Sequence, residues 1–271
     1  MSGEKPARRF GLVAAFATVS GMTMLSRILG FVRDMLIARF LGAGDMADAY
    51  VIAFRLPNLF RRWFAEGAFN AAFVPLFSRT LEQDGRDEAK VFAGRTLTLL
   101  GLSLLVLTVL AELFMPQLMA LFAPGFQDTP AKAQLTVTYG RIMFPYLTFM
   151  ALMALYGGVL NAFHKFAAAA FAPVMLNVVL IIALLAVVPH APDTGEVLSW
   201  GIAVAGVVQW VVVFVALERE RFGLRPAWPR MTPRMKKLLV LMVPGILAGG
   251  VTQINIVGGS SIASQADGAV T

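Results

Sequence analysis

Six arginines interrupt two apolar stretches near the start of the chain, and their type and spacing could do chemistry. They are Arg27, Arg33 and Arg39 in the first stretch and Arg55, Arg61 and Arg62 in the second, with Asp34, Asp48 and Glu66 close by. An arginine at the centre of a membrane helix costs about 2.5–3.5 kcal/mol on insertion scales. The planar guanidinium donates two parallel hydrogen bonds to phosphate oxygens and keeps its charge. The excess of basic over acidic residues therefore predicts a water-filled cavity that binds a phosphate or diphosphate.

The spacing places these groups on shared helix faces. At about 100° per residue, one arc of the first stretch contains Ser20, Thr23, Arg27, Gly30 and Asp34. In the second stretch, Arg55, Asn58 and Arg62 recur at i, i+3 and i+7, and Glu66 follows one turn later. The sequence thus predicts a polar stripe on each of two otherwise apolar helices.

A structural interpretation of the same arginines is also open. Arginines near helix ends can extend to the membrane interface, which suits Arg33 and Arg39 best. Pairs such as Arg27 with Asp34 and Arg62 with Glu66 could neutralise one another. Because basic residues outnumber acidic ones in the set, pairing leaves a positive excess that still requires an anionic guest.

The composition excludes a soluble globule. The chain has 271 residues, of which 58% are hydrophobic and 14% charged, whereas a soluble domain has about 25% charged residues. The basic residues behind the net charge of +7 lie in short breaks between apolar stretches or inside the stretches themselves and do not cluster on a polar domain, so no nucleic-acid partner is expected. The sequence has no cysteine and two histidines and shows no catalytic or metal-binding motif. We therefore expect neither an enzyme nor a metal or other cofactor.

Seven apolar stretches are long enough to cross about 30 Å of hydrocarbon. They cover approximately residues 10–40, 47–77, 91–122, 141–162, 166–188, 197–217 and 238–262. The predicted fold is an all-α, polytopic helical bundle of about seven transmembrane helices, preceded by a cytoplasmic tail at 1–9. Basic residues concentrate in alternate breaks, and the other breaks hold little beyond Lys132. This alternation predicts a cytoplasmic N-terminus.

Polar residues in the later stretches are fewer. Thr252 and Asn255 share a face of the last stretch and are predicted to line the same cavity. Single amides such as Asn177 and Gln209 are expected to bond a neighbouring helix rather than a substrate.

Five segments carry a resemblance to a known family. They are residues 22–78, the APGF at 123–126, the RIMFPY at 141–146, the GGVLNAFHKF at 157–166 and the FAPVMLN at 171–177. Together they resemble the MurJ (MviN) family of lipid II flippases, within the multidrug, oligosaccharidyl-lipid and polysaccharide exporter superfamily. The similarity covers nearly the whole chain.

The resemblance implies the N-terminal lobe of a two-lobe transporter in the bacterial inner membrane. Lipid II, the undecaprenyl-diphosphate-linked peptidoglycan precursor, would pass from the cytoplasmic to the periplasmic leaflet by alternating access, driven by a coupling ion or the membrane potential. The other implied partners are membrane lipids, and the implied roles are in cell-wall biogenesis and cell shape. By resemblance, Arg27, Arg33 and Arg61 are the diphosphate contacts. Further matches to the family pattern are Ser26, Asp34, Asp48, Asn58, Arg62 and Glu66.

The two arguments differ over the second stretch. The helical wheel favours Arg55 and Arg62, whereas the resemblance favours Arg61. We follow the resemblance, because Pro57 makes the wheel unreliable beyond it.

The chain is about half the family length, so we expect it to be a fragment without the C-terminal lobe and unable to transport alone. Two alternatives stay open. The chain could belong to a flippase for another polyprenyl-diphosphate glycan, or to a membrane enzyme acting on lipid diphosphates.

Overall fold

The computed structural model describes residues 6–61 and 68–244, and every regular element in these ranges is helical. The α-helices are α1 (Pro6–Leu41), α2 (Asp45–Arg61), α3 (Ala68–Gln83), α4 (Gly85–Leu113), α5 (Met115–Phe122), α6 (Pro130–Met143), α7 (Tyr146–Ala162), α8 (Ala167–Ile182), α9 (Thr194–Arg219) and a helix over 233–244. Short 3-10 turns occupy Pro124–Asp128 and Val188–His190, and a π-helical turn occupies Ala183–Val187. The predicted all-α class is confirmed.

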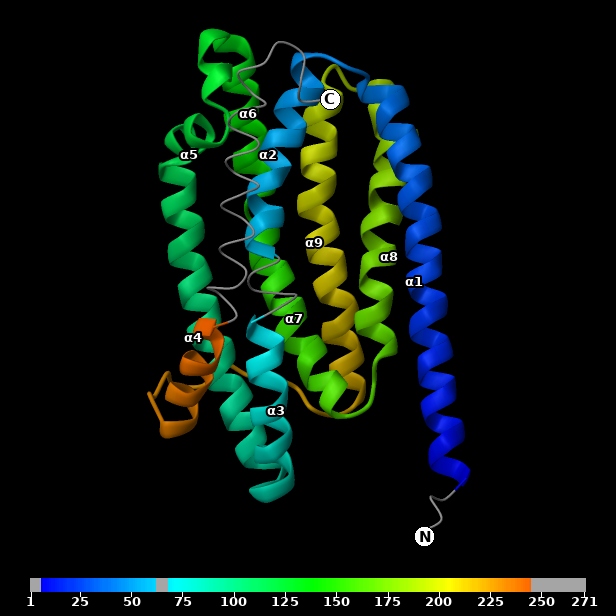
Figure 1. Ribbon diagram of the computed structural model, residues 1–271, viewed down its shortest axis with the longest axis vertical. Helices are drawn as coiled ribbons and strands as arrows, with labels where there is room; N and C mark the ends of the chain where they lie inside the picture. Colours follow the sequence, from blue (N-terminus) through cyan, green and yellow to red (C-terminus); the bar gives the residue numbers. More distant parts are fainter. Residues whose placement is uncertain (1–5, 62–67, 245–271) are drawn as a thin grey trace.

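The long helices run side by side along the long axis of the molecule (Figure 1). α9 packs against both α7 and α8, and α1 lies at the edge of the bundle against α8. α2 packs against α6, and α3 packs against α7 and α4. The first two helices, which carry the predicted site arginines, therefore have different main neighbours, although both also contact α9.

Four helical segments among the described residues are long and apolar enough to cross a membrane. They are Gly85–Leu113, Pro130–Ala162, Ala167–His190 and Thr194–Arg219. They correspond to the third, fourth, fifth and sixth predicted spans and confirm the polytopic helical class. The total of seven stays a prediction, because the first two predicted spans are not among these four and the last one enters the described part only as the helix over 233–244.

Glycines mark two of the sharp breaks. Gly42 and Gly44, between α1 and α2, have φ angles of 66° and 130°, and Gly85, between α3 and α4, has 86°. A residue with a Cβ is strained at such positive φ angles, so glycine suits these positions. The apolar pattern alone predicts a loop over residues 78–90. Instead, α3 continues to Gln83 and α4 starts at Gly85, because polar residues extend both helices beyond their apolar stretches.

Proline determines a break inside the fourth predicted span. α6 ends at Met143 and α7 begins at Tyr146, directly after Pro145. Proline has no backbone N–H, and its ring clashes with the preceding turn. The chain is therefore interrupted between two helices at Pro145, and the span itself begins at Pro130, earlier than the predicted start at residue 141.

Candidate anion-binding site

Arg33 is a predicted anion contact whose side chain is held by two described residues, Asp34 and Asn177. Its side chain is 23% exposed. Nε and Nη2 donate hydrogen bonds to Oδ1 of Asp34 at 3.0 and 2.7 Å, and Nη1 donates to Oδ1 of Asn177 at 2.8 Å. A guanidinium has five N–H groups, so these three bonds leave one N–H on each terminal nitrogen. Arg33 is thus held in one orientation with donors to spare for an anion.

Asn177 of α8 connects Arg33 to the backbone of α1. Its Nδ2 donates to the carbonyl oxygen of Ser26 at 2.8 Å and lies 3.3 Å from the Ser26 hydroxyl. Gly30 faces the same amide, since a Cβ there would lie 3.7 Å from Asn177 Nδ2. The expectation that Asn177 bonds a neighbouring helix is confirmed. Nothing in the sequence pattern indicates that its partner is the guanidinium of Arg33, a predicted site residue.

The predicted polar stripe of α1 divides between two environments. Of its five residues, Gly30 is half-buried toward α8, whereas Ser20, Thr23, Arg27 and Asp34 are exposed. Ser26 and Arg33, which lie outside the predicted stripe, are half-buried on the same side as Gly30. Asp34 pairs with Arg33 rather than with Arg27. Arg27 makes no ion pair with another described residue, which leaves its charge uncompensated within this part of the chain. Arg39, at the end of α1, lies 5.6 Å from the centre of the Phe40 ring.

Among the described residues, Asp48 pairs with a lysine and with no arginine. This buried carboxylate pairs through Oδ2 with Lys132 Nζ on α6, and the same ammonium lies 3.3 Å from Asp45 Oδ1 and 4.2 Å from the ring centre of Phe126. The pair joins the first turns of α2 and α6. Asp48 is therefore in an ion pair, but its partner Lys132 stands out in the sequence only as an isolated basic residue.

Several predicted site residues lie outside the described part of the chain or have undescribed side chains. Arg55 and Asn58 are half-buried on α2, and Arg61 is its last residue, with an undescribed side chain. Arg62, Glu66, Thr252 and Asn255 lie outside the described residues. Convergence of both arginine sets on one cavity therefore stays a prediction.

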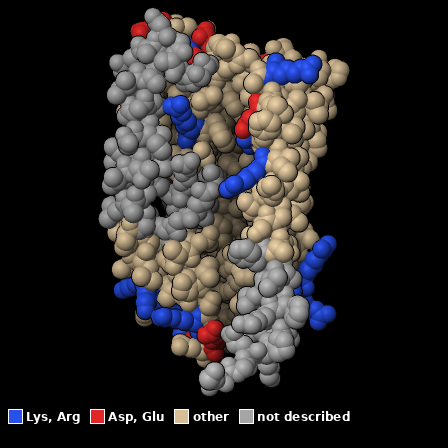
Figure 2. All heavy atoms as spheres, turned by 45° about the vertical axis from the view of Figure 1, so that its right-hand side comes forward, with Lys and Arg blue, Asp and Glu red and all other residues tan. Residues whose placement is uncertain are grey.

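The surface on the side of α1 is hollowed. Figure 2 shows basic and acidic side chains beside a hollow in this face, and further charged side chains at its lower end. Such a hollow beside α1 is compatible with water reaching the polar stripe.

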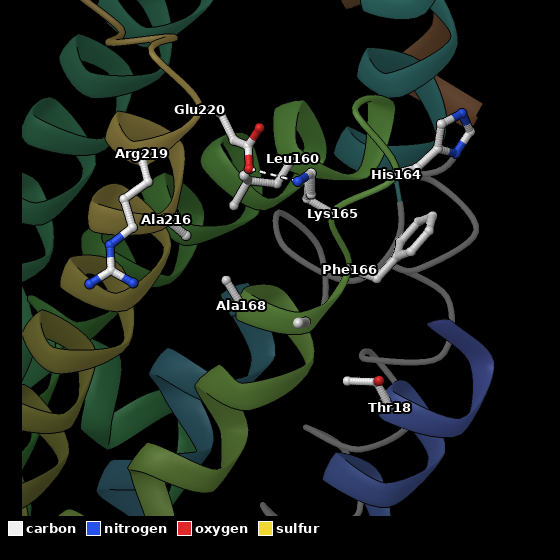
Figure 3. Close-up of a pocket in the computed structure, with 10 residues that line it drawn as sticks. Thr18, Leu160, His164, Lys165, Phe166, Ala168, Ala216, Arg219 and Glu220 are labelled. Atoms are coloured by element: carbon white, nitrogen blue, oxygen red, sulfur yellow. Dashed lines mark ion pairs between the residues drawn. The ribbon is translucent and has the colours of Figure 1, made fainter. Parts of the chain in front are cut away.

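A separate pocket of about 310 Å³ lies between Thr18 of α1, the α7–α8 connection and the end of α9 (Figure 3). Lys165 pairs there with Glu220 at 2.9 Å. Arg27 and Arg33 do not line this pocket. The described arginines of the predicted anion site therefore lie outside this pocket.

Comparisons with known proteins agree with this architecture. A probable lipid II flippase MurJ from Rhizobium meliloti (strain 1021) is 49% identical over 266 residues, which are 96% of this chain and 49% of that protein. The lipid II flippase MurJ of Burkholderia cenocepacia is 40% identical over 94% of this chain and 50% of its own length. The chain spans about half the length of the curated relatives it matches.

The fold of this chain is also similar to that of solved transporter structures. A lipid II flippase MurJ in an inward closed conformation superposes with a TM-score of 0.75 at 27% identity, covering 93% of this chain and 51% of that one. A multidrug transporter of the MATE family shares the fold alone, with a TM-score of 0.67 at 15% identity over 89% of this chain and 53% of its own. The family model described as "Lipid II flippase MurJ" matches residues 37–271. The chain therefore belongs to the lipid II flippase MurJ family.

Proposed function

We propose that this chain forms one lobe of a transporter that moves lipid II across the bacterial inner membrane. Its relatives from Rhizobium meliloti and Burkholderia cenocepacia are named as a probable lipid II flippase and a lipid II flippase. In this proposal the chain binds and orients the substrate and does no covalent chemistry. The N-terminus of α1 faces the cytoplasm.

The geometry of Arg33 is the observation that carries the proposal. Asn177 and Asp34 fix its guanidinium at the contact between α1 and α8, and one N–H remains on each terminal nitrogen. Two preoriented donors match two oxygens of a diphosphate. Arg27 lies on the exposed side of the same helix and adds positive charge that no described carboxylate neutralises. Arg55, Arg61 and Arg62 of the second helix complete the site in this proposal.

Movement of the substrate requires two lobes that rock against each other. A coupling ion or the membrane potential supplies the free energy, since one charge crossing 100 mV gains about 2.3 kcal/mol. Only a few coupled charges are therefore needed.

The test is lipid II export by the whole protein that contains this chain. We expect Arg27→Ala and Arg61→Ala to abolish export while the protein stays in the membrane at its normal level. Arg39→Ala is the matched control, because Arg39 lies at the end of α1 against Phe40 and should leave export intact. Normal export by both site variants would refute the assignment.

The lipid-linked substrate is tested by competition. Purified protein should bind lipid II in preference to polyprenyl diphosphates with other sugars. Equal competition by these other compounds would transfer the proposal to a different lipid-linked glycan.

A further inference from the structure

The segment that follows α9 is strongly basic and lies on the surface. Residues 221–232 join α9 to the helix over 233–244, and we call them the cationic strap. The stretch 221–237 contains six basic residues and no acidic one, namely Arg221, Arg225, Arg230, Arg234, Lys236 and Lys237. All six are exposed. Arg234 pairs with Asp84 at 2.6 Å, and the other five make no ion pair with another described residue.

The middle of the cationic strap is fixed on α4. The backbone N–H of Ala227 lies 3.1 Å from the hydroxyl of Thr98 and bonds the carbonyl of Gly94 at 3.3 Å, and Thr98 donates to the Ala227 carbonyl at 2.8 Å. A Cβ at Gly94 would lie 2.5 Å from the carbonyl oxygen of Arg225. Only glycine allows the strap to approach α4 this closely.

Both ends of the cationic strap are fixed as well. Before it, Arg86 Nη2 donates to the carbonyl of Glu220 at 2.6 Å. Phe222 is fully buried against Phe77 and Phe163. After it, the pair between Arg234 and Asp84 ties the next helix to the α3–α4 turn. The strap is therefore a positioned part of the bundle rather than a loose linker.

The strap lies at the level where α4 changes from polar to apolar. The first turns of α4 contain Arg86, Asp87, Glu88 and Lys90. From Leu102 onward, one helical turn beyond Thr98, α4 exposes large apolar side chains, as expected of a surface in contact with lipid tails. Trp228, directly after the anchored Ala227, is 80% exposed. Tryptophan is enriched at the membrane–water interface.

A groove of about 870 Å³ lies along the strap, and its lining has a polar part and an apolar part. Its polar lining comes from Lys90, Arg221 and Arg225 with one carboxylate, Glu218. Its apolar lining includes Val91 and Phe214. Three cations against one anion favour a negatively charged group, and the apolar walls suit the first carbons of an acyl chain.

We propose that this groove and the cationic strap bind an anionic phospholipid of the adjacent leaflet, with the phosphate at Lys90, Arg221 and Arg225 and the indole of Trp228 at headgroup level. None of the described arginines of α1 and α2 lines this groove, so the proposal does not depend on transport. Basic segments next to membrane helices attract anionic lipids by about 1 kcal/mol per residue, about fivefold in affinity. An alternative role for the same basic residues is to set the orientation of the helices during membrane insertion. That role alone would give the folded protein no preference for anionic over neutral lipids.

The absence of cysteine from the sequence allows a direct test. Met231, 53% exposed on the strap, is replaced by cysteine and labelled with a fluorophore. The protein is placed in nanodiscs that contain equal fractions of phosphatidylglycerol and phosphatidylcholine, with either lipid brominated. We expect brominated phosphatidylglycerol to quench the label severalfold more strongly. Equal quenching by the two lipids would overturn the proposal.

Variants localise the effect. The double variant Lys90→Gln with Arg225→Gln should remove the preference for phosphatidylglycerol, so that the two brominated lipids quench equally. Arg79→Gln, which changes an exposed arginine of α3 outside the groove, should leave the preference unchanged. Gly94→Ala keeps every charge but displaces the strap, and should also reduce the preference. Gly101→Ala on the same helix is its control, because a Cβ there meets nothing within 4 Å. Unchanged size-exclusion and thermal profiles verify the fold of each variant.

Two further outcomes would contradict the assignment. If Arg79→Gln weakened the preference as much as the groove variants, diffuse charge rather than a built site would be responsible. If phosphate buffer removed the preference while chloride of equal ionic strength did not, the site would bind inorganic phosphate and not a lipid.

Discussion

The ion pair between Lys132 and Asp48 should contribute more to stability than the exposed pairs of this chain. The Lys132 and Asp48 side chains are 14% and 10% exposed, so water and salt screen their interaction weakly. Oδ1 of Asp48 already has no hydrogen-bond partner among the described residues. Replacing Lys132 with methionine would leave a buried carboxylate uncompensated. Removal of one partner from a buried pair costs about 3–5 kcal/mol.

The expected effect is a lower unfolding temperature. For a chain of this size, about 3–5 kcal/mol corresponds to a fall of about 6–20 °C. The assay is thermal unfolding in detergent, followed through a cysteine placed at the fully buried Ala205 that reacts with a thiol dye when α9 opens. No background thiol exists, because the sequence lacks cysteine.

Two comparisons separate charge loss from packing loss. The double variant Lys132→Met with Asp48→Asn should recover most of the stability, because no buried charge is left unpaired. Lys165→Met, which breaks the exposed pair with Glu220, should cost less than about 1 kcal/mol. Equal losses for Lys132→Met and Lys165→Met, with no recovery in the double variant, would refute the reasoning.

Two other substitutions test the packing of the bundle. Asn177→Leu should destabilise the protein by about 1–3 kcal/mol, because Arg33 loses its partner on α8. The same loss should loosen the contact between α1 and α8, which is measured as a wider distance between spin labels on these two helices. Gly195→Ala should lower the unfolding temperature, because a Cβ would lie 2.5 Å from the Tyr139 hydroxyl. The same change at Gly101 should have no effect.

The sequence was sufficient for the helical membrane class because uncharged apolar stretches of about 20 residues are typical of membrane-spanning helices. Helix ends were less predictable. Hydropathy marks where apolar residues stop, but α3 continues to Gln83 through polar residues that are compatible with an exposed helix. The breaks near Gly42 and Pro145 follow from backbone sterics, but Pro57 and Pro173 lie inside continuous helices, so proline alone does not locate a helix end.

The residues of the candidate site were identifiable, but their partners were not. An arginine in an apolar stretch is conspicuous in any sequence. Its partner can be any polar group that the fold brings near, and Asn177 is 144 residues from Arg33. The wheel also grouped Gly30 with Arg27, whereas the contact with α8 places Gly30 with Ser26 and Arg33. A periodicity argument describes one helix and carries no information about which neighbour covers each side.

The two arginines of α1 should therefore respond differently to loss of charge. Arg33 is part of a hydrogen-bonded unit with Asn177 and Asp34, so its removal disturbs the contact between α1 and α8 as well as any anion site. Arg27 is exposed and makes no ion pair with another described residue, so its removal changes charge with little effect on packing. A loss of export in Arg27 variants is thus the cleaner evidence for anion binding. A loss in Arg33 variants counts as such only when the unfolding temperature is unchanged.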